Sequence, residues 1–107
     1  MDSAVLIESF SDFAKTKNID RPTQENMGTL LSAHKYLTDV LRSSTGIAKR
    51  SLVSKYLHFH APHAVFIYDS IANNKVRKIL APSKLRFKLQ REHDHEYEAF
   101  VRRCIYF

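Results

Sequence analysis

The chain has 107 residues, a length that suits one domain and is too short for two domains of ordinary size. A hydrophobic content of 44% excludes a disordered chain, and two Gly and three Pro are too few for many short strands and tight turns. The single cysteine excludes an intramolecular disulfide and a thiolate zinc site within one chain. Because no long apolar run occurs, we expect a cytoplasmic protein without a membrane partner.

The first predicted helix covers residues 3–17. Ser3 can cap its start, and Leu6, Phe10 and Phe13 recur at spacings of four and three residues. This spacing places the three apolar side chains on one face, which predicts an amphipathic helix packed against a core.

A second, longer helix is predicted over residues 22–42. Pro22 suits the first turn of a helix, where its missing N–H costs nothing. Residues 43–46 then combine three hydroxyl side chains with Gly46, which favours a turn. The apolar stripe of this helix consists of Met27, Leu30, Leu31, Leu37, Val40 and Leu41.

Two more helices follow the turn at Gly46. Apolar residues keep helical spacing up to about Phe59, and Pro62 ends that helix. The apolar link over residues 65–68 is too short for a helix and is expected to be buried. Asp69 suits the N-cap of the next helix, which continues to about residue 80.

The last part of the chain contains a short alternating segment and a final helix. Residues 84–89 alternate basic and apolar side chains, which suits a short extended segment. The final helix begins near His93, with Tyr97, Phe100 and Cys104 facing inwards. The predicted fold is therefore all-α, with about five helices around one core in a single domain over residues 1–107.

Positive charge is concentrated in the second half of the chain. The net charge is +6, and from Arg42 to Arg91 the only acid is Asp69. A basic surface of this kind binds polyanions through counterion release, although a solvated basic surface without a ligand has the same composition. The basic residues of this section are Arg42, Lys49, Arg50, Lys55, Lys75, Arg77, Lys78, Lys84, Arg86, Lys88 and Arg91.

A motif within residues 30–80 resembles the central motif of the helix-hairpin-helix DNA glycosylase superfamily. The segment GIAKRS from Gly46, a helix, a turn at Pro62 and Asp69 at the start of the next helix follow that family's order. The resemblance implies a hairpin at Gly46 that seats a phosphate. It also implies that Asp69 activates water during cleavage of an N-glycosidic bond. Two stretches, 54–59 and 67–70, are also similar to uncharacterised bacterial proteins.

Two positions depart from the family pattern and indicate a degenerate or truncated relative. Ala48 replaces the second glycine of the hairpin. Arg50 stands where bifunctional members carry a nucleophilic lysine, and a guanidinium cannot supply the neutral amine that forms a Schiff base. The chain is also shorter than the full glycosylase fold, so lyase chemistry is not expected.

We predict a nucleic-acid-binding helical module that contacts phosphates, with DNA favoured over RNA. One alternative is a reduced glycosylase-like enzyme that uses Asp69 as its catalytic residue, against a simple helix cap at this position. Another is a toxin, immunity or inhibitor type of protein-interaction module, and a protein partner or a homo-oligomer is compatible with each. The predicted nucleic-acid-binding residues are Gly46, Lys49, Arg50, Lys55, Lys75, Arg77, Lys78, Lys84, Arg86 and Lys88.

The histidines do not predict a metal site. His58, His60 and His63 lie close in sequence, but on a helix His58 and His60 point in nearly opposite directions, whereas ligands on one face need spacings of three or four. We therefore expect neither a bound metal nor a cofactor.

Overall fold

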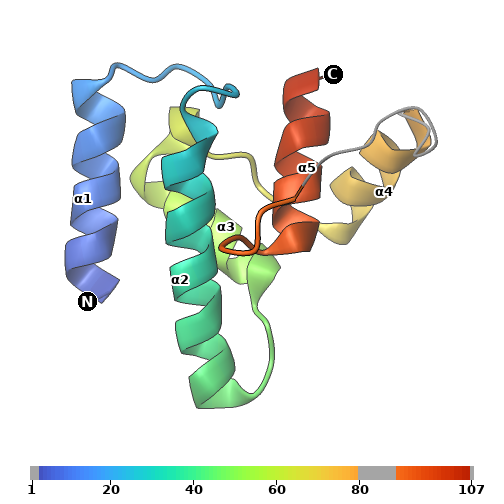
Figure 1. Cartoon of the computed structure of the whole chain (residues 1–107), viewed down its shortest axis with the longest axis horizontal. Helices are drawn as coiled ribbons and strands as arrows, with labels where there is room; N and C mark the ends of the chain where they lie inside the picture. The colour runs from blue at the N-terminus through green and yellow to red at the C-terminus, as the bar shows by residue number, and fades with distance from the viewer. Residues whose placement is uncertain (1–2, 80–88, 107) are drawn as a thin grey trace.

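A computed structural model describes residues 3–79 and 89–106 of the chain (Figure 1). These residues form five α-helices and a short 3-10 helix without any strand, which confirms the predicted all-α class. None of the described helices combines the length and apolar character needed to cross a membrane. The helices are α1 (Ser3–Thr16), α2 (Met27–Thr45), α3 (Arg50–His60), η1 (Pro62–Ala64), α4 (Ser70–Ile79) and α5 (His95–Tyr106).

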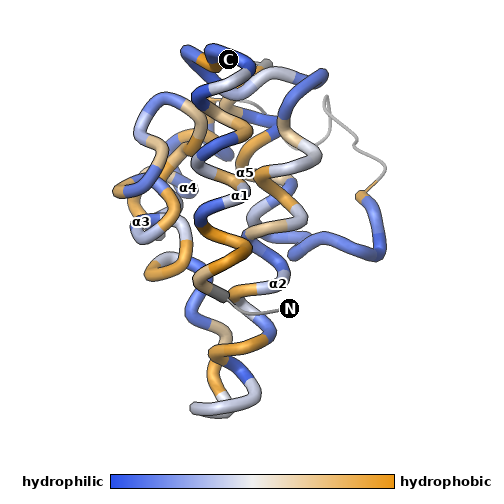
Figure 2. The backbone as a smooth tube through the Cα atoms, turned by 90° about the vertical axis from the view of Figure 1, so that its left-hand side faces the viewer, coloured by the Kyte–Doolittle hydropathy of each residue, from blue (hydrophilic) through white to orange (hydrophobic). Residues whose placement is uncertain are grey.

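Helix α2 is the centre of the arrangement, because α1, α3 and α5 all pack against it. Helix α4 packs against α5, on the side of the molecule away from α1 (Figure 1). The tube in Figure 2 shows apolar and polar positions alternating along the helices, as expected for helices with one buried face.

The buried apolar side chains form one cluster that joins four helices. Burying one Leu or Phe side chain stabilises the fold by about 1.5 to 3 kcal/mol, so this cluster is the main source of stability. Its largest contributions are Phe10 from α1, Leu30 and Leu31 from α2, Val53 and Leu57 from α3, and Tyr97, Phe100 and Val101 from α5.

Helix α2 begins at Met27, five residues later than predicted, because a local turn replaces its first turn. The N–H of Thr23 donates to Asn26 Oδ1 at 2.8 Å, and Asn26 Nδ2 donates to the carbonyl of Arg21 at 3.1 Å. An Asn side chain that bonds nearby backbone groups competes with helical hydrogen bonds. The predicted start at Pro22 is therefore wrong.

The other end of α2 extends into the predicted turn and reaches Thr45. The hydroxyls of Ser44 and Thr45 donate back to carbonyls one turn earlier, which satisfies them within the helix. Gly46 then ends the helix with φ +76°, a conformation that favours glycine. Residues 46–49 connect α2 to α3. The assignment of this connection to a helix-hairpin-helix element stays a prediction.

The link between η1 and α4 is only partly buried, so the predicted burial is wrong for one residue. Val65 is buried, and Phe66 and Tyr68 are half-buried, whereas Ile67 is 36% exposed. The hydroxyl of Ser54 joins this link to α3, because it accepts a hydrogen bond from the N–H of Tyr68 at 2.8 Å.

Helix α5 begins at His95 because Asp94 caps it, with Asp94 Oδ1 accepting from the N–H of Tyr97 at 2.9 Å. Tyr97 and Phe100 are buried as predicted, and Cys104 is half-buried. Of the predicted extended segment 84–89, residues 84–88 lie outside the described residues, and Leu89 belongs to no helix or strand.

Candidate nucleic-acid interface

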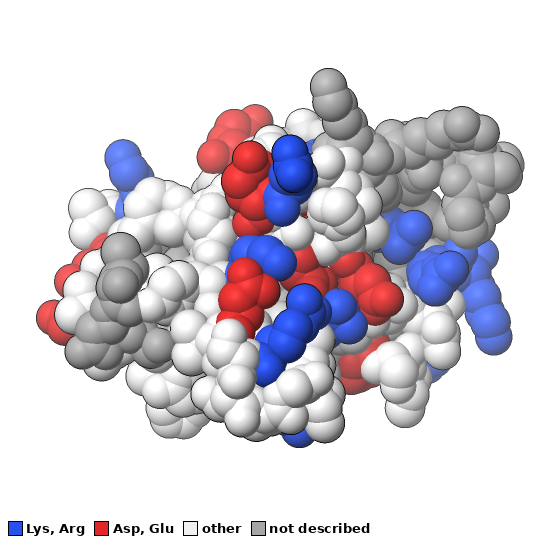
Figure 3. Space-filling model, turned by 60° about the horizontal axis from the view of Figure 1, so that its bottom comes forward, with Lys and Arg blue, Asp and Glu red and all other residues white. Residues whose placement is uncertain are grey.

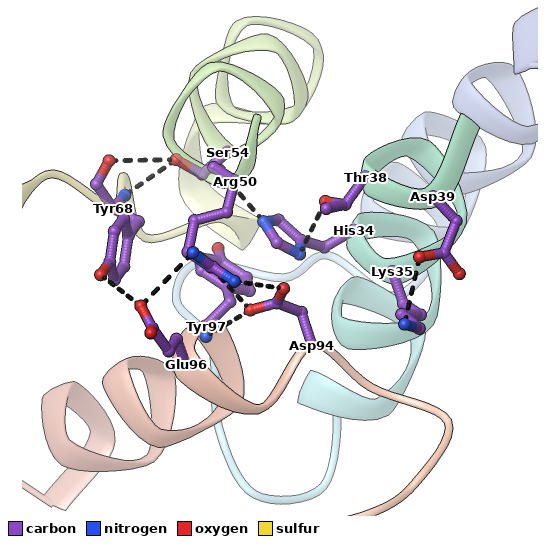
Figure 4. A network of polar contacts seen from close by, with 10 residues as sticks. All are labelled: His34, Lys35, Thr38, Asp39, Arg50, Ser54, Tyr68, Asp94, Glu96 and Tyr97. Atoms are coloured by element: carbon purple, nitrogen blue, oxygen red, sulfur yellow. Dashed lines mark hydrogen bonds and ion pairs between the residues drawn. The ribbon is translucent and has the colours of Figure 1, made fainter. Parts of the chain in front are cut away.

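A network of charged side chains joins the start of α3 to the start of α5 (Figure 4). Arg50 binds Asp94 through two parallel contacts, Nε to Oδ1 at 2.9 Å and Nη2 to Oδ2 at 3.0 Å. Its Nη1 lies 3.4 Å from Glu96 Oε2, and the hydroxyl of Tyr68 donates to the same oxygen at 3.2 Å. Arg50 thus joins α3 to α5, and Tyr68 joins the link to α5 through Glu96.

The protonation states in this network follow from burial and hydrogen bonding. Burial of Asp94 would raise its pKa, but hydrogen bonds from Arg50 and from the N–H of Tyr97 outweigh burial and lower that pKa. The hydrogen bond to Asp94 raises the pKa of Arg50 in return. Both groups are therefore charged over the ordinary pH range.

A buried histidine supports the backbone of Arg50 from the other side. His34 lies 3.1 Å through Nε2 from the carbonyl of Arg50, so Nε2 must carry the hydrogen, and Nδ1 can accept from the Thr38 hydroxyl at 3.4 Å. Its ring stacks on Tyr97 with centroids 3.9 Å apart. Burial lowers the pKa of His34 to about 4, so the ring is neutral at pH 7. His34 could not be singled out from the sequence, because a histidine on an apolar helix face belongs to no recognisable motif.

The structure places Arg50 differently from the predicted phosphate contacts. Its guanidinium is bound to Asp94, whose side chain is only 5% exposed, and to Glu96. A phosphate would have to displace or share these carboxylates. We therefore leave Arg50 out of the candidate interface.

Gly46 also lies in a setting that does not suit the predicted phosphate seat. Its N–H donates to the carbonyl of Arg42 at 2.7 Å and completes the end of α2. A backbone donor used in this way has no hydrogen left for an anion. Three further predicted residues, Lys84, Arg86 and Lys88, lie outside the described residues.

A cleft of about 610 Å³ lies between the first turns of α3 and α4. Its lining includes Lys49, Lys55 and Ser51 from the α3 side, and Asp69 and Ser70 from the α4 side. Three predicted cationic residues, Lys49, Arg50 and Lys55, thus line one cleft with the candidate catalytic residue Asp69, although they are up to 20 positions apart in sequence. Of the three, Arg50 is the one that is paired with carboxylates.

Asp69 caps α4. Its Oδ1 accepts a hydrogen bond from the N–H of Ala72 at 2.7 Å. A side chain in this position satisfies one of the first N–H groups of the helix, which have no partner within it. The cap accounts for one carboxylate oxygen, while the residue still lines the cleft.

The basic residues of α4, which are Lys75, Arg77 and Lys78, are exposed. No carboxylate of the described residues pairs with them or with Lys49 and Lys55. Figure 3 shows the contrast, with blue and red side chains alternating at the centre of the view and blue ones gathered towards its right-hand side, where α4 lies in Figure 1.

A second ion-pair network surrounds Glu98, which is fully buried in α5. The carboxylate accepts hydrogen bonds from the N–H of Gln90 at 3.0 Å, from His93 Nδ1 at 3.1 Å and from Arg102 Nε at 2.9 Å. Burial would raise the pKa of Glu98, but these hydrogen bonds lower it. Within residues 3–79 and 89–106, no three His, Cys, Asp or Glu side chains lie close enough together to hold a metal ion.

An apolar groove of about 320 Å³ runs between α1, α2 and α3. Its lining includes Ile7, Leu37 and Val40, together with Leu52 and Tyr56, which are 55% and 49% exposed. Val40 belongs to the apolar stripe predicted for residues 22–42, and the structure leaves it at the surface.

Comparison with known proteins found no match for this chain. No protein-family model matches the chain, and neither a curated protein nor a solved structure is significantly similar to it.

Proposed function

We propose that this protein binds the phosphate backbone of a nucleic acid. The observation that carries the proposal is a set of basic side chains that no carboxylate of the described residues neutralises, on α4 and around the cleft between α3 and α4. Such charges attract a polyanion and release its counterions on binding. The set consists of Lys49, Lys55, Lys75, Arg77 and Lys78, and we call it the cationic set.

The charges on the two sides of this cleft determine where a phosphate backbone would bind. The first N–H groups of α3 have no partner within the helix and favour an anion. Asp69 lies at the α4 side of the same cleft and repels one. We therefore expect phosphates at the rim, near Lys49 and Lys55, rather than beside Asp69. Contacts of this kind position the protein on nucleic acid without reading bases.

The proposal is tested by removing equal charge from two parts of the molecule. In the interface variant, Lys55, Lys75 and Lys78 are replaced by Gln. In the control variant, Lys15, Lys17 and Arg21 are replaced by Gln, which removes three exposed positive charges at the α1 end of the molecule.

Affinity for a short fluorescent DNA duplex is then measured by anisotropy at one salt concentration. The interface variant is expected to lose about tenfold or more in affinity, while the control loses much less. An equal loss in both variants would mean that net charge alone attracts DNA, and no interface would then exist at the cationic set. Single-stranded DNA and RNA of matched length, titrated in parallel, identify the preferred polymer.

A second candidate function is protein interaction, which the apolar groove between α1, α2 and α3 favours. Exposed apolar side chains grouped in a groove are a feature of interaction surfaces. Sedimentation velocity at several concentrations tests whether a second copy of the chain occupies the groove. Self-association that Leu52→Ser and Tyr56→Ser together abolish supports this, and a monomer at every concentration contradicts it.

A further inference from the structure

A separate cleft of about 350 Å³ lies between α4 and α5. Asn73 and Arg77 face it from α4 at a spacing of four residues, which places them on one side of the helix. Ala99 and Arg103 face it from α5 at the same spacing.

The two arginines of this cleft are not neutralised by the described residues. Neither Arg77 nor Arg103 forms an ion pair there, and the buried Nε of Arg103 has no hydrogen-bond partner. Residues 80–88, which follow α4 in sequence, contain no Asp or Glu that could supply a carboxylate. A buried guanidinium donor without an acceptor is costly, and an anion removes that cost.

The electrostatics of the cleft agree with this geometry. Burial lowers the pKa of Arg103, and the positive charge of Arg77 lowers it further. The two guanidinium groups therefore repel one another across the space that an anion would occupy.

The other polar side chains of the cleft do not cancel this charge. Glu96 lines the cleft, but its Oε2 accepts from the hydroxyl of Tyr68 and contacts Arg50, and Figure 4 shows the carboxylate pointing towards those two residues. His95 Nε2 lies 3.1 Å from the carbonyl of Gln90. The amide of Asn73 can donate to an oxyanion as well.

We propose that Arg77 and Arg103 bind a phosphate group in the cleft between α4 and α5. A guanidinium binds phosphate oxygens through paired N–H donors, and two of them on facing helices can hold one tetrahedral anion. The phosphate can belong to a small phosphomonoester or to the end of a nucleic acid, which share this chemistry. The inference does not rest on the proposed binding of a nucleic-acid backbone, because it concerns a single anion in a defined cleft.

The test uses inorganic phosphate as the probe and two-dimensional NMR of the labelled protein, at constant ionic strength maintained with chloride. Phosphate is expected to shift the backbone signals of α4 and α5 in a saturable way. Arg77→Gln is expected to raise the apparent dissociation constant by about tenfold or more, because it removes one charged hydrogen-bonding group. Lys15→Gln, at an exposed lysine of α1 that lies outside both the cleft and the cationic set, is expected to leave the constant unchanged.

Thermal unfolding without phosphate provides an independent readout. Arg77→Gln relieves the repulsion with Arg103, so its Tm is expected to equal or exceed that of the unsubstituted protein. Phosphate should then raise the Tm of the unsubstituted protein and not that of the variant. Phosphate shifts no larger than those of chloride, or an equal response in Arg77→Gln and Lys15→Gln, would overturn the proposal.

The same experiment separates the possible sources of the phosphate. A 5′-phosphorylated oligonucleotide that binds more tightly than its unphosphorylated form through Arg103 identifies a nucleic-acid end. Equal binding of the two oligonucleotides, together with saturable binding of inorganic phosphate, identifies a small phosphomonoester. If the protein binds phosphate in this cleft but does not bind duplex DNA through the cationic set, only the proposed function is contradicted.

Discussion

At the junction of α3 with α5 and on α4, arginine side chains have opposite electrostatic environments. At the junction, Arg50 is bound to the buried carboxylate of Asp94 and to Glu96. On α4, Arg77 is exposed and pairs with no carboxylate of the described residues. The first guanidinium holds two helices together, whereas the second is available to a ligand. Net charge alone therefore overstates how much positive charge a partner can meet.

The largest expected effect concerns the junction. Asp94→Ala leaves the Arg50 guanidinium without its main partner and α5 without its cap, so we expect a loss of about 3 to 5 kcal/mol in the free energy of unfolding. Urea denaturation measures it. Asp39→Ala is the matched control, because the exposed Lys35–Asp39 pair is expected to contribute less than about 1 kcal/mol. Equal losses in the two variants would show that the junction is no more important than a surface pair.

The pH dependence of stability tests the histidine behind the junction. His34 has an ordinary pKa of 6.5 and a folded-state pKa of about 4, so the unfolded chain takes up a proton more readily. Stability is complete above pH 6.5 and is lost as the pH falls towards 4, by about 3 kcal/mol in total. Asp94 and Glu98 have ordinary pKa values of 3.8 and 4.5, and both pKa values are lowered in the fold. Protonation of these carboxylates therefore removes further stability at the acid end of this range and below it.

Urea denaturation at several pH values measures this loss. In His34→Gln the amide can still donate to the carbonyl of Arg50 but does not titrate, so the decline between pH 6.5 and 4.5 is expected to flatten. A decline of unchanged slope in His34→Gln would assign the acid sensitivity to other groups.

The smallest expected effect concerns Asp69 at the start of α4. Asp69→Ala removes the cap and is expected to cost about 1 kcal/mol, whereas Asp69→Asn retains a capping oxygen and costs less. A base-release assay on DNA with the unsubstituted protein and Asp69→Asn separates a cap from a catalytic carboxylate. We expect no difference between them, and activity that Asp69→Asn abolishes would favour the glycosylase-like alternative.

The helices could largely be predicted from the sequence because apolar spacing is a local property. Leu30, Leu31 and Leu37 recur on one face of α2, and that face is buried. The start of α2 could not be predicted in this way, because Asn26 binds the backbone of Thr23 and Arg21 in preference to extending the helix. Neither helix propensity nor the position of Pro22 indicated that turn.

The site could be predicted only in part, because ion pairing joins residues that are far apart in sequence. Arg50 meets Asp94 from 44 positions away, and no pattern in either segment indicates the contact. Arg103 was not predicted to bind an anion, because it lies in a section of the chain that also contains several acids. Its charge becomes available because Glu98 is occupied by Arg102 and His93.

The salt dependence of DNA binding tests the central claim most directly. If the five residues of the cationic set contact duplex phosphates, log K should fall with log salt at a slope of about −4.5. Replacing Lys55, Lys75 and Lys78 by Gln should reduce the magnitude of that slope by about 3, while replacing Lys15, Lys17 and Arg21 should leave it unchanged. The same slope in both variants would contradict the account, because the unpaired charges of α4 and the neighbouring cleft would then not be where a nucleic acid binds.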